Sequence, residues 1–151
     1  MATGRIVVGV DGSEPSLAAL RWAAGQSALT GEPLQAVIAW EYPATSWAGM
    51  APGGPVPMPP PDFDPEDLAR RTLDEALKTT LDPAVAAAVE RRAVNGHAAQ
   101  ALLESAEGAS LLVVGDRGHS GFRAALLGSV SLHVTQHAPC PVVVVRGAGR
   151  S

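Results

Sequence analysis

Short apolar runs alternate with segments of helical character along this chain, and this alternation limits the fold more than any other feature does. The runs cover residues 5–10, 34–40, 110–114 and 142–145 and consist largely of valine, isoleucine, leucine and alanine. Strands that are apolar on both sides are typical of parallel sheets covered by helices on both faces. Strands that alternate with helices are joined by right-handed crossovers. We therefore predict an α/β fold, a five-stranded parallel doubly wound sheet with helices on both faces.

The helical segments have recognisable ends. The first is predicted over residues 14–30, because Ser13 is a favourable N-cap, Pro15 suits the first turn and Gly31 favours a stop. The same reasoning predicts further helices over residues 64–82, 97–107 and 129–137. The expected buried faces carry Leu17, Leu20, Ala24 and Ala28 in the first helix, Ala69, Leu73, Ala76 and Leu77 in the second, and Ala99, Leu102, Leu103 and Ala106 in the third.

Residues 85–94 fit two interpretations. Their alanines suit a helix, but they lie directly before Asn95-Gly96 and a further helical segment. A strand in this position would complete the alternation. We therefore predict an edge strand over residues 85–94.

The chain has the length of one domain. At 151 residues and 15.4 kDa it can bury a sizeable core. Residues 43–61 hold seven prolines and three glycines, too few backbone donors and too little apolar content for a strand or helix. We predict a single domain over residues 1–151 that contains a long proline-rich loop over residues 43–61.

Charge and cysteine content exclude several functional classes. With 11 basic and 15 acidic side chains, the net charge of −4 argues against a nucleic-acid footprint and a polybasic membrane surface. The first apolar run is too short for a signal-peptide core or a membrane span, so a cytoplasmic location is expected. The single cysteine, Cys140, rules out an intrachain disulfide and is expected to be packed rather than reactive.

The fold predicts where a ligand would bind. In open parallel sheets the ligand lies beyond the carboxyl ends of the strands, where the winding direction changes. Two loops would meet there, GVDGSEPS at residues 9–16 and GDRGHSG at residues 115–121. If the first and fourth strands are neighbours, Asp11 faces the glycine-rich loop across one crevice.

The glycine-rich loop suits an anion. A side chain at Gly115 or Gly118 would block a ligand from the backbone N–H groups of the turn. Gly128 and Ser129 begin a helix whose free N–H groups and positive dipole end attract phosphate. Ser129 could donate its hydroxyl to that anion, or it could serve only as the N-cap.

Asp11 suits a different part of a nucleotide. A carboxylate repels phosphate, so its natural partner is a neutral donor such as a ribose hydroxyl. Locally, Asp11 could equally well do no more than cap the turn at Gly12.

The spacing of these glycines resembles a known family. Gly115-Asp116-Arg117-Gly118, nine further residues and then Gly128-Ser129 is similar to the Gly-x2-Gly-x9-Gly-Ser/Thr signature of the ATP-binding universal stress proteins. The opening VVGVDGS and the closing HAPCPVVVVR resemble the same family. The resemblance spans almost the whole chain apart from the proline-rich loop, and it implies a Rossmann-like fold of the adenine nucleotide alpha hydrolase type.

The resemblance also implies residue roles. Asp11 would face the ribose, Ala39 or Trp40 would meet the adenine, and Gly115 would approach the ribose and first phosphate. Trp40 is larger than the residue often found there, so it could stack on adenine or pack beneath the proline-rich loop. The full set implied at the nucleotide is Gly9, Val10, Asp11, Ser13, Ala39, Trp40, Gly115, Arg117, Gly118, His119, Gly128, Ser129, Val130 and Ser131. Family members are typically dimers, often paired through the last strand, so a homodimer is expected.

The absence of a loop lysine predicts binding rather than rapid chemistry. The only lysine, Lys78, lies in the predicted second helix, and no Gly-Lys-Ser/Thr sequence exists. Without a lysine, an acidic metal pair or an evident base, phosphoryl transfer lacks its usual groups. We expect ATP, with Mg²⁺ held by the phosphates and not by the protein, in a nucleotide-dependent sensor or regulator of a stress response.

Two alternatives stay open. One is a slow ATPase or autokinase with Ser120 or Ser129 as the acceptor, and the other is a cyclic AMP-binding protein.

His133 and His137 have the i, i+4 spacing that zinc ligands can have, but no third ligand is evident nearby, so a structural role is expected.

Overall fold

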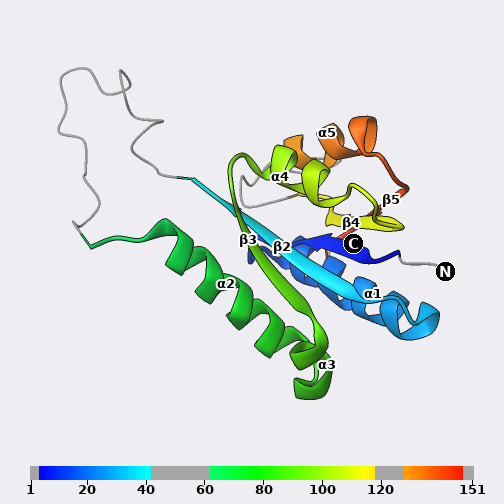
Figure 1. Cartoon of the computed structure of the whole chain (residues 1–151), viewed down its shortest axis with the longest axis horizontal. Coiled ribbons are helices and arrows are strands. Elements are labelled where there is room, and N and C mark those ends of the chain that lie inside the picture. The colour runs from blue at the N-terminus through cyan, green and yellow to red at the C-terminus, as the bar shows by residue number, and fades with distance from the viewer. Residues whose placement is uncertain (1–3, 42–61, 118–127, 148–151) are drawn as a thin grey trace.

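The computed structural model describes residues 4–41, 62–117 and 128–147, and in these the predicted α/β fold is confirmed. Five parallel strands form one sheet in the order β3-β2-β1-β4-β5, with helices on both faces (Figure 1). In chain order the elements are β1 (Ile6–Gly9), α1 (Glu14–Thr30), β2 (Leu34–Trp40), α2 (Pro65–Thr80), α3 (Pro83–Ala88), β3 (Glu90–Asn95), α4 (Ala98–Ser105), β4 (Leu111–Gly115), α5 (Ser129–His137) and β5 (Val142–Val145). The proline-rich loop predicted over residues 43–61 lies outside the described residues.

The core consists of two apolar layers, one on each face of the sheet. Ile6 and Val8 of β1 pack with α1 and α2, whereas Val7 between them packs with α4 and α5. Side chains alternate between the two faces along a strand, so a strand covered on both sides must be apolar throughout. This explains the unbroken valine and leucine runs of the sequence.

The ends of α1 lie where the sequence predicts them. The Ser13 hydroxyl accepts a hydrogen bond from the Ser16 N–H at 3.4 Å, and Gly31 ends the helix in the left-handed conformation, at φ 81°. The predicted buried face is wrong in part, because Leu17 and Ala24 are only half-buried and Ala28 is exposed. Apolar residues occur all around this helix, so its sequence pattern defines no single face. The residues that are buried are Pro15, Ser16, Ala19, Leu20 and Ala23.

The segment predicted as a strand over residues 85–94 divides into two elements. Residues 83–88 form α3, since Pro83 suits a first helical turn and alanine has the highest helix propensity. The strand β3 begins at Glu90 and pairs with β2 from Gln35↔Glu90 to Trp40↔Asn95. Its place at the edge of the sheet confirms the predicted position. The predicted start at residue 85 is five residues too early, because β3 begins at Glu90.

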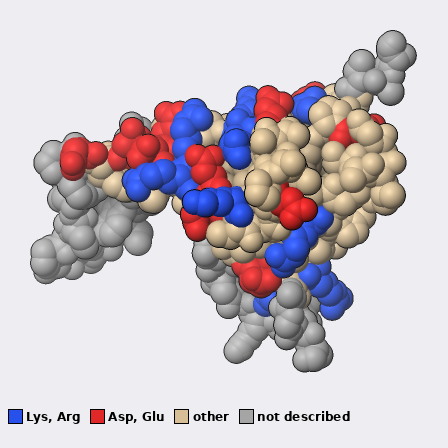
Figure 2. Space-filling model, turned by 90° about the horizontal axis from the view of Figure 1, so that it is seen from below, with Lys and Arg blue, Asp and Glu red and all other residues tan. Residues whose placement is uncertain are grey.

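Surface charges on the α2 side of the molecule are largely paired. Two i, i+4 ion pairs follow α2, Arg70–Glu66 at 2.7 Å and Arg71–Asp67 at 2.9 Å. Basic and acidic side chains intermingle on the face seen in Figure 2. Among the residues that the structure describes, no helix combines the length and apolar character needed to cross a membrane.

Candidate functional site

The winding direction of the sheet changes between β1 and β4. These strands are neighbours, in the register Ile6↔Leu111, Val7↔Leu112 and Val8↔Val113. The chain leaves β1 toward α1 on one face and leaves β4 toward α5 on the other. The first and fourth strands are therefore neighbours, which is the condition stated above for a crevice between them. The carboxyl ends of β1 and β4 define the expected ligand position.

A cleft of about 110 Å³ lies at this position. It is formed by the carboxyl ends of β1, β2 and β4, by the first turn of α1, and by α4 and α5. Apolar side chains and a few polar groups share its lining, as is typical of small-molecule sites. The lining residues are Gly9, Val10, Asp11, Ser16, Val37, Ala39, Ala98, Leu102, Val114, Gly115, Arg117, Val130 and Ser131.

The structure brings most of the predicted site residues into this cleft. Those that line it are Gly9, Val10, Asp11, Ala39, Gly115, Arg117, Val130 and Ser131. Ser13, Trp40, Gly128 and Ser129 are described but do not line it. Gly118 and His119 lie outside the described residues.

The alternation of side chains along β2 separates Ala39 from Trp40. Ala39 lines the cleft together with Val37, on the α4 and α5 face. Trp40 packs against the other apolar layer, which contains α1 and α2. Of the two residues predicted to meet an adenine, only Ala39 is therefore on the cleft side.

Asp11 is fixed by the turn that begins α1. Its Oδ1 accepts hydrogen bonds from the Ser13 N–H at 2.9 Å and from the Ser13 hydroxyl at 2.5 Å. The Asp11 N–H donates to the Ser16 hydroxyl at 3.2 Å, and that hydroxyl donates to the Ser13 carbonyl at 2.9 Å. Asp11 thus stabilises the turn and lines the cleft at once. Among the described residues, both hydrogen bonds to its side chain use Oδ1, so Oδ2 is available to a further donor.

The start of α5 is tied to the end of β4. The Gly128 N–H donates to the Asp116 carbonyl at 2.8 Å, and the Ser131 hydroxyl donates to the Gly115 carbonyl at 2.5 Å. Gly128 is the N-cap residue and provides no side-chain cap, so Ser129 is not the N-cap but the first helical residue. The first N–H groups of α5 therefore lack an N-cap side chain, which is the arrangement that suits an anion.

Two glycines allow close packing around the cleft. A Cβ atom on Gly115 would lie 2.6 Å from the Pro15 carbonyl carbon and 2.7 Å from its oxygen. A Cβ atom on Gly9 would lie 2.9 Å from Cδ1 of Leu102. Gly115 is thus required for the close approach of α1 to β4. This packing role is separate from the contact with a ligand that the sequence predicts for Gly115.

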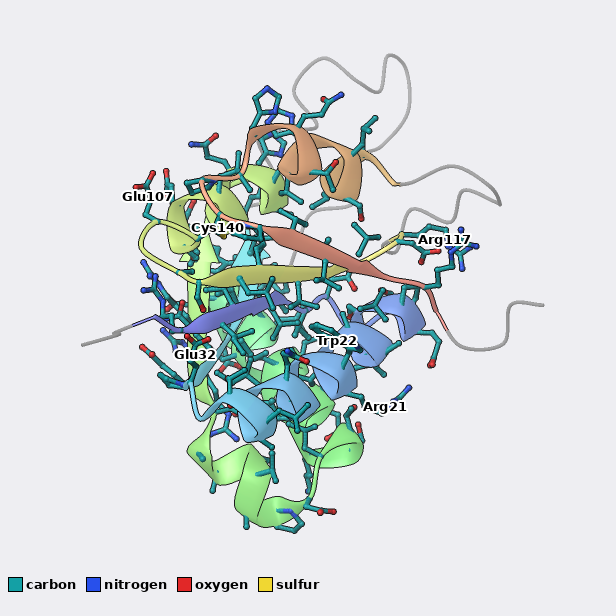
Figure 3. All side chains as sticks on the ribbon, turned by 90° about the vertical axis from the view of Figure 1, so that its right-hand side faces the viewer. Arg21, Trp22, Glu32, Glu107, Arg117 and Cys140 are labelled. Carbon is teal, nitrogen blue, oxygen red and sulfur yellow. The ribbon has the colours of Figure 1, made fainter. Side chains whose placement is uncertain are left out.

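Asp116 and Arg117 place opposite charges at the β4 side of the cleft. Arg117 Nε lies 3.7 Å from Asp116 Oδ1, and their side chains are 21% and 14% exposed. Both atoms are buried and have no hydrogen-bond partner among the described residues. Figure 3 shows Arg117 just beyond the end of β4.

Several cleft residues were not predicted from the sequence: Ser16, Val37, Ala98, Leu102 and Val114. Val37 shares a face with Ala39 because the two are separated by two positions, and this spacing could have identified it. Leu102 belongs to the predicted buried face of its helix, where only the folded arrangement shows that it reaches a cleft.

Cys140 and the histidine pair of α5 do not line the cleft. Cys140 is half-buried near the opposite end of the sheet from Arg117 (Figure 3). Burial raises the pKa of its thiol, and the nearby Arg5 charge lowers the pKa by a smaller amount, so the thiol is a poor nucleophile. The rings of His133 and His137 stack with centroids 4.5 Å apart. Within the described ranges, no group of three or more His, Cys, Asp or Glu side chains could hold a metal ion.

Comparison with known proteins gives one consistent result. The model of the universal stress protein family matches residues 3–146. A universal stress protein of Mycobacterium tuberculosis is 34% identical over 144 residues, which are 93% of this chain and 46% of that protein. The chain thus spans about half the length of the curated relatives it matches.

Solved structures agree with this result. A universal stress protein in complex with cAMP is 30% identical and has a TM-score of 0.60, with 96% of this chain and 98% of that chain covered. UspA from Lactobacillus plantarum shares the fold at 21% identity and a TM-score of 0.71, with 97% and 99% covered.

Proposed function

The chain belongs to the universal stress protein family, and from this premise we propose that its cleft binds an adenine nucleotide. The observation that carries the proposal is the cleft itself. It lies at the change of winding direction and combines an apolar wall, a fixed carboxylate and the start of a helix.

Each part of a nucleotide has a matching part of the cleft. Val37, Ala39 and Leu102 provide an apolar surface suited to the adenine ring. Asp11 Oδ2 can accept a hydrogen bond from a ribose hydroxyl, while Oδ1 is held by Ser13. The phosphates would then lie toward β4 and the first N–H groups of α5, whose dipole favours negative charge.

We further propose ATP as the ligand, with Mg²⁺ held through the phosphates, and a nucleotide-dependent sensor or regulator as the role of the protein. The spaced glycines at 115, 118 and 128 support a triphosphate. Cyclic AMP is the second candidate, because a 30% identical universal stress protein has been solved in complex with it. Calorimetric titration with each nucleotide separates the two candidates.

Replacing Gly128 with valine should weaken ATP binding at least tenfold, or about 1.4 kcal/mol. Gly128 does not itself line the cleft, but it is the N-cap residue, so the added side chain would stand beside the first N–H groups of α5 that we assign to the phosphates. Gly128 has φ −67° and ψ 166°, a conformation open to any residue, so the backbone should not be strained. Calorimetry measures the affinity, and circular dichroism checks the fold. Unchanged affinity in a folded variant would contradict the proposed phosphate position.

Bound ATP should turn over far more slowly than the roughly 1–100 s⁻¹ typical of kinases. Backbone donors that bind the ground state and the transition state equally well provide affinity without acceleration. The measurement is phosphate release under saturating ATP and Mg²⁺, with a chelator control. Turnover above about one per second that disappears in the Gly128→Val variant would identify an ATPase instead.

We also propose a homodimer joined through β5, the edge strand that faces the viewer in Figure 3. The Pro141 and Val145 carbonyls accept hydrogen bonds from the N–H groups of Leu112 and Asp116, both at 2.9 Å. Backbone groups of alternate residues point to opposite sides of a strand, so those of Val142 and Val144 point away from β4. Such an edge pairs readily with a second strand.

Val144→Pro should convert the dimer into a folded monomer, because proline removes an outward N–H but no donor to β4. Light scattering at micromolar concentration measures the molecular mass. A monomeric unaltered protein, or a variant that stays dimeric, would be incompatible with pairing through β5.

A further inference from the structure

Asp116 occupies a fixed position at the β4 side of the cleft. Its N–H donates to the Val145 carbonyl at 2.9 Å, and its carbonyl accepts from the Gly128 N–H at 2.8 Å. The backbone that carries this carboxylate is thus held by β5 on one side and by the start of α5 on the other. The next residue, Arg117, lines the cleft.

The contact between these two side chains is incomplete. At 3.7 Å, Arg117 Nε and Asp116 Oδ1 attract each other but are too far apart for a hydrogen bond. Both atoms are buried without a hydrogen-bond partner among the described residues. Buried polar atoms of this kind call for a further partner. Arginine can present two parallel N–H groups to a phosphate, so an anion in the cleft is a suitable one.

The charge balance limits what Arg117 can provide. Among the described residues, the charged side chains that line the cleft are Asp11 and Arg117, and the Asp116 carboxylate lies beside Arg117 without lining the cleft itself. The carboxylate beside Arg117 offsets much of its positive charge at short range. Each added phosphate therefore gains less from Arg117 than it would from an unpaired arginine.

We propose that Asp116 is a specificity-determining residue, which acts through Arg117 to limit the preference of the cleft for nucleotides with longer phosphate chains. The inference rests on the proposed binding of adenine nucleotides. In this proposal Asp116 positions Arg117 and offsets part of its charge, and other residues make the contacts to adenine and ribose.

The test compares the affinities of adenosine, AMP and ATP for the full chain and for Asp116→Asn, at constant ionic strength and magnesium. Calorimetry should show ATP binding strengthened about tenfold, AMP about threefold and adenosine less than about twofold. Adenosine serves as an internal standard, because a general change in the fold would alter all three affinities. Asp116→Ser provides a second variant if Asp116→Asn is unstable to heat.

Two further variants isolate the mechanism. Asp74→Asn removes an equal charge from α2, where Asp74 pairs with Arg91 at 3.1 Å on the other face of the sheet, and should leave the ratio of ATP to adenosine affinity unchanged. In an Arg117→Gln background, the gain from Asp116→Asn should largely disappear. An unchanged ratio in Asp116→Asn, or an equal gain without Arg117, would overturn the inference while nucleotide binding persists. Failure of the unaltered chain to bind any of the three would overturn the proposed function, and the inference with it.

Discussion

Replacing Gly115 with alanine is expected to lower the free energy of unfolding by about 1–3 kcal/mol, the usual effect of overpacking a filled core. The new Cβ would lie 2.6 Å from the carbonyl carbon of Pro15. Because that atom belongs to the backbone, no side-chain rotation can relieve the contact, and the start of α1 must move. Urea denaturation of the variant and the unaltered protein measures the loss.

Gly25→Ala is the matched control for this substitution. Gly25 lies within α1, and a Cβ atom there would meet nothing within 4 Å. Alanine in a helix interior is favoured over glycine by about 0.5–1 kcal/mol, so this variant should gain stability. If Gly115→Ala were as stable as Gly25→Ala, the close packing of β4 against Pro15 would be refuted.

The fold was largely predictable because its signals are local. Ser13, Gly31 and Asp64 mark helix ends through their own side chains or backbone conformation, and these ends are found as predicted. The unbroken valine runs indicate strands that are buried on both faces of the sheet. The buried face of α1 was mispredicted, because small apolar residues surround that helix and only the contact with the sheet selects one side.

The candidate site was predictable in its loops but not in its walls. Asp11 lies two residues beyond the end of β1 and Gly115 is the last residue of β4, so the neighbouring positions of these two strands bring them together. Leu102 reaches the cleft from α4, far away in the sequence, and no local pattern indicates this. The pairing of Asp116 with Arg117 also depends on how the folded chain buries two adjacent charged residues.

β2 shows why the adenine contact could not be assigned from the sequence. Both faces of its LQAVIAW run are covered, so polar and apolar residues do not alternate in a way that identifies the cleft side. Only the packing of Val37 with α4 and α5, and of Ile38 with α1 and α2, separates the faces. Along β2, Ala39 therefore lies on the same face as Val37, and Trp40 lies on the same face as Ile38.

Ala39→Phe is therefore expected to weaken ATP binding by about 100-fold or more, equivalent to about 2.7 kcal/mol. The ring would fill the part of the cleft that we assign to adenine. Phenylalanine has a high strand propensity, so β2 should still form. Calorimetric titration measures the affinity, and circular dichroism establishes that the variant is folded.

Ala28→Phe is the control for adding a ring elsewhere, because Ala28 is exposed near the end of α1 and does not line the cleft. Its ATP affinity should equal that of the unaltered protein. Comparing these two variants also tests which of Ala39 and Trp40 contacts the adenine. A nucleotide stacked on Trp40 would lie on the opposite face of β2, and its binding would not be affected by Ala39→Phe. Unchanged ATP affinity in the folded Ala39→Phe variant would therefore contradict the proposed adenine contact with Ala39 and would favour the Trp40 face of the sheet.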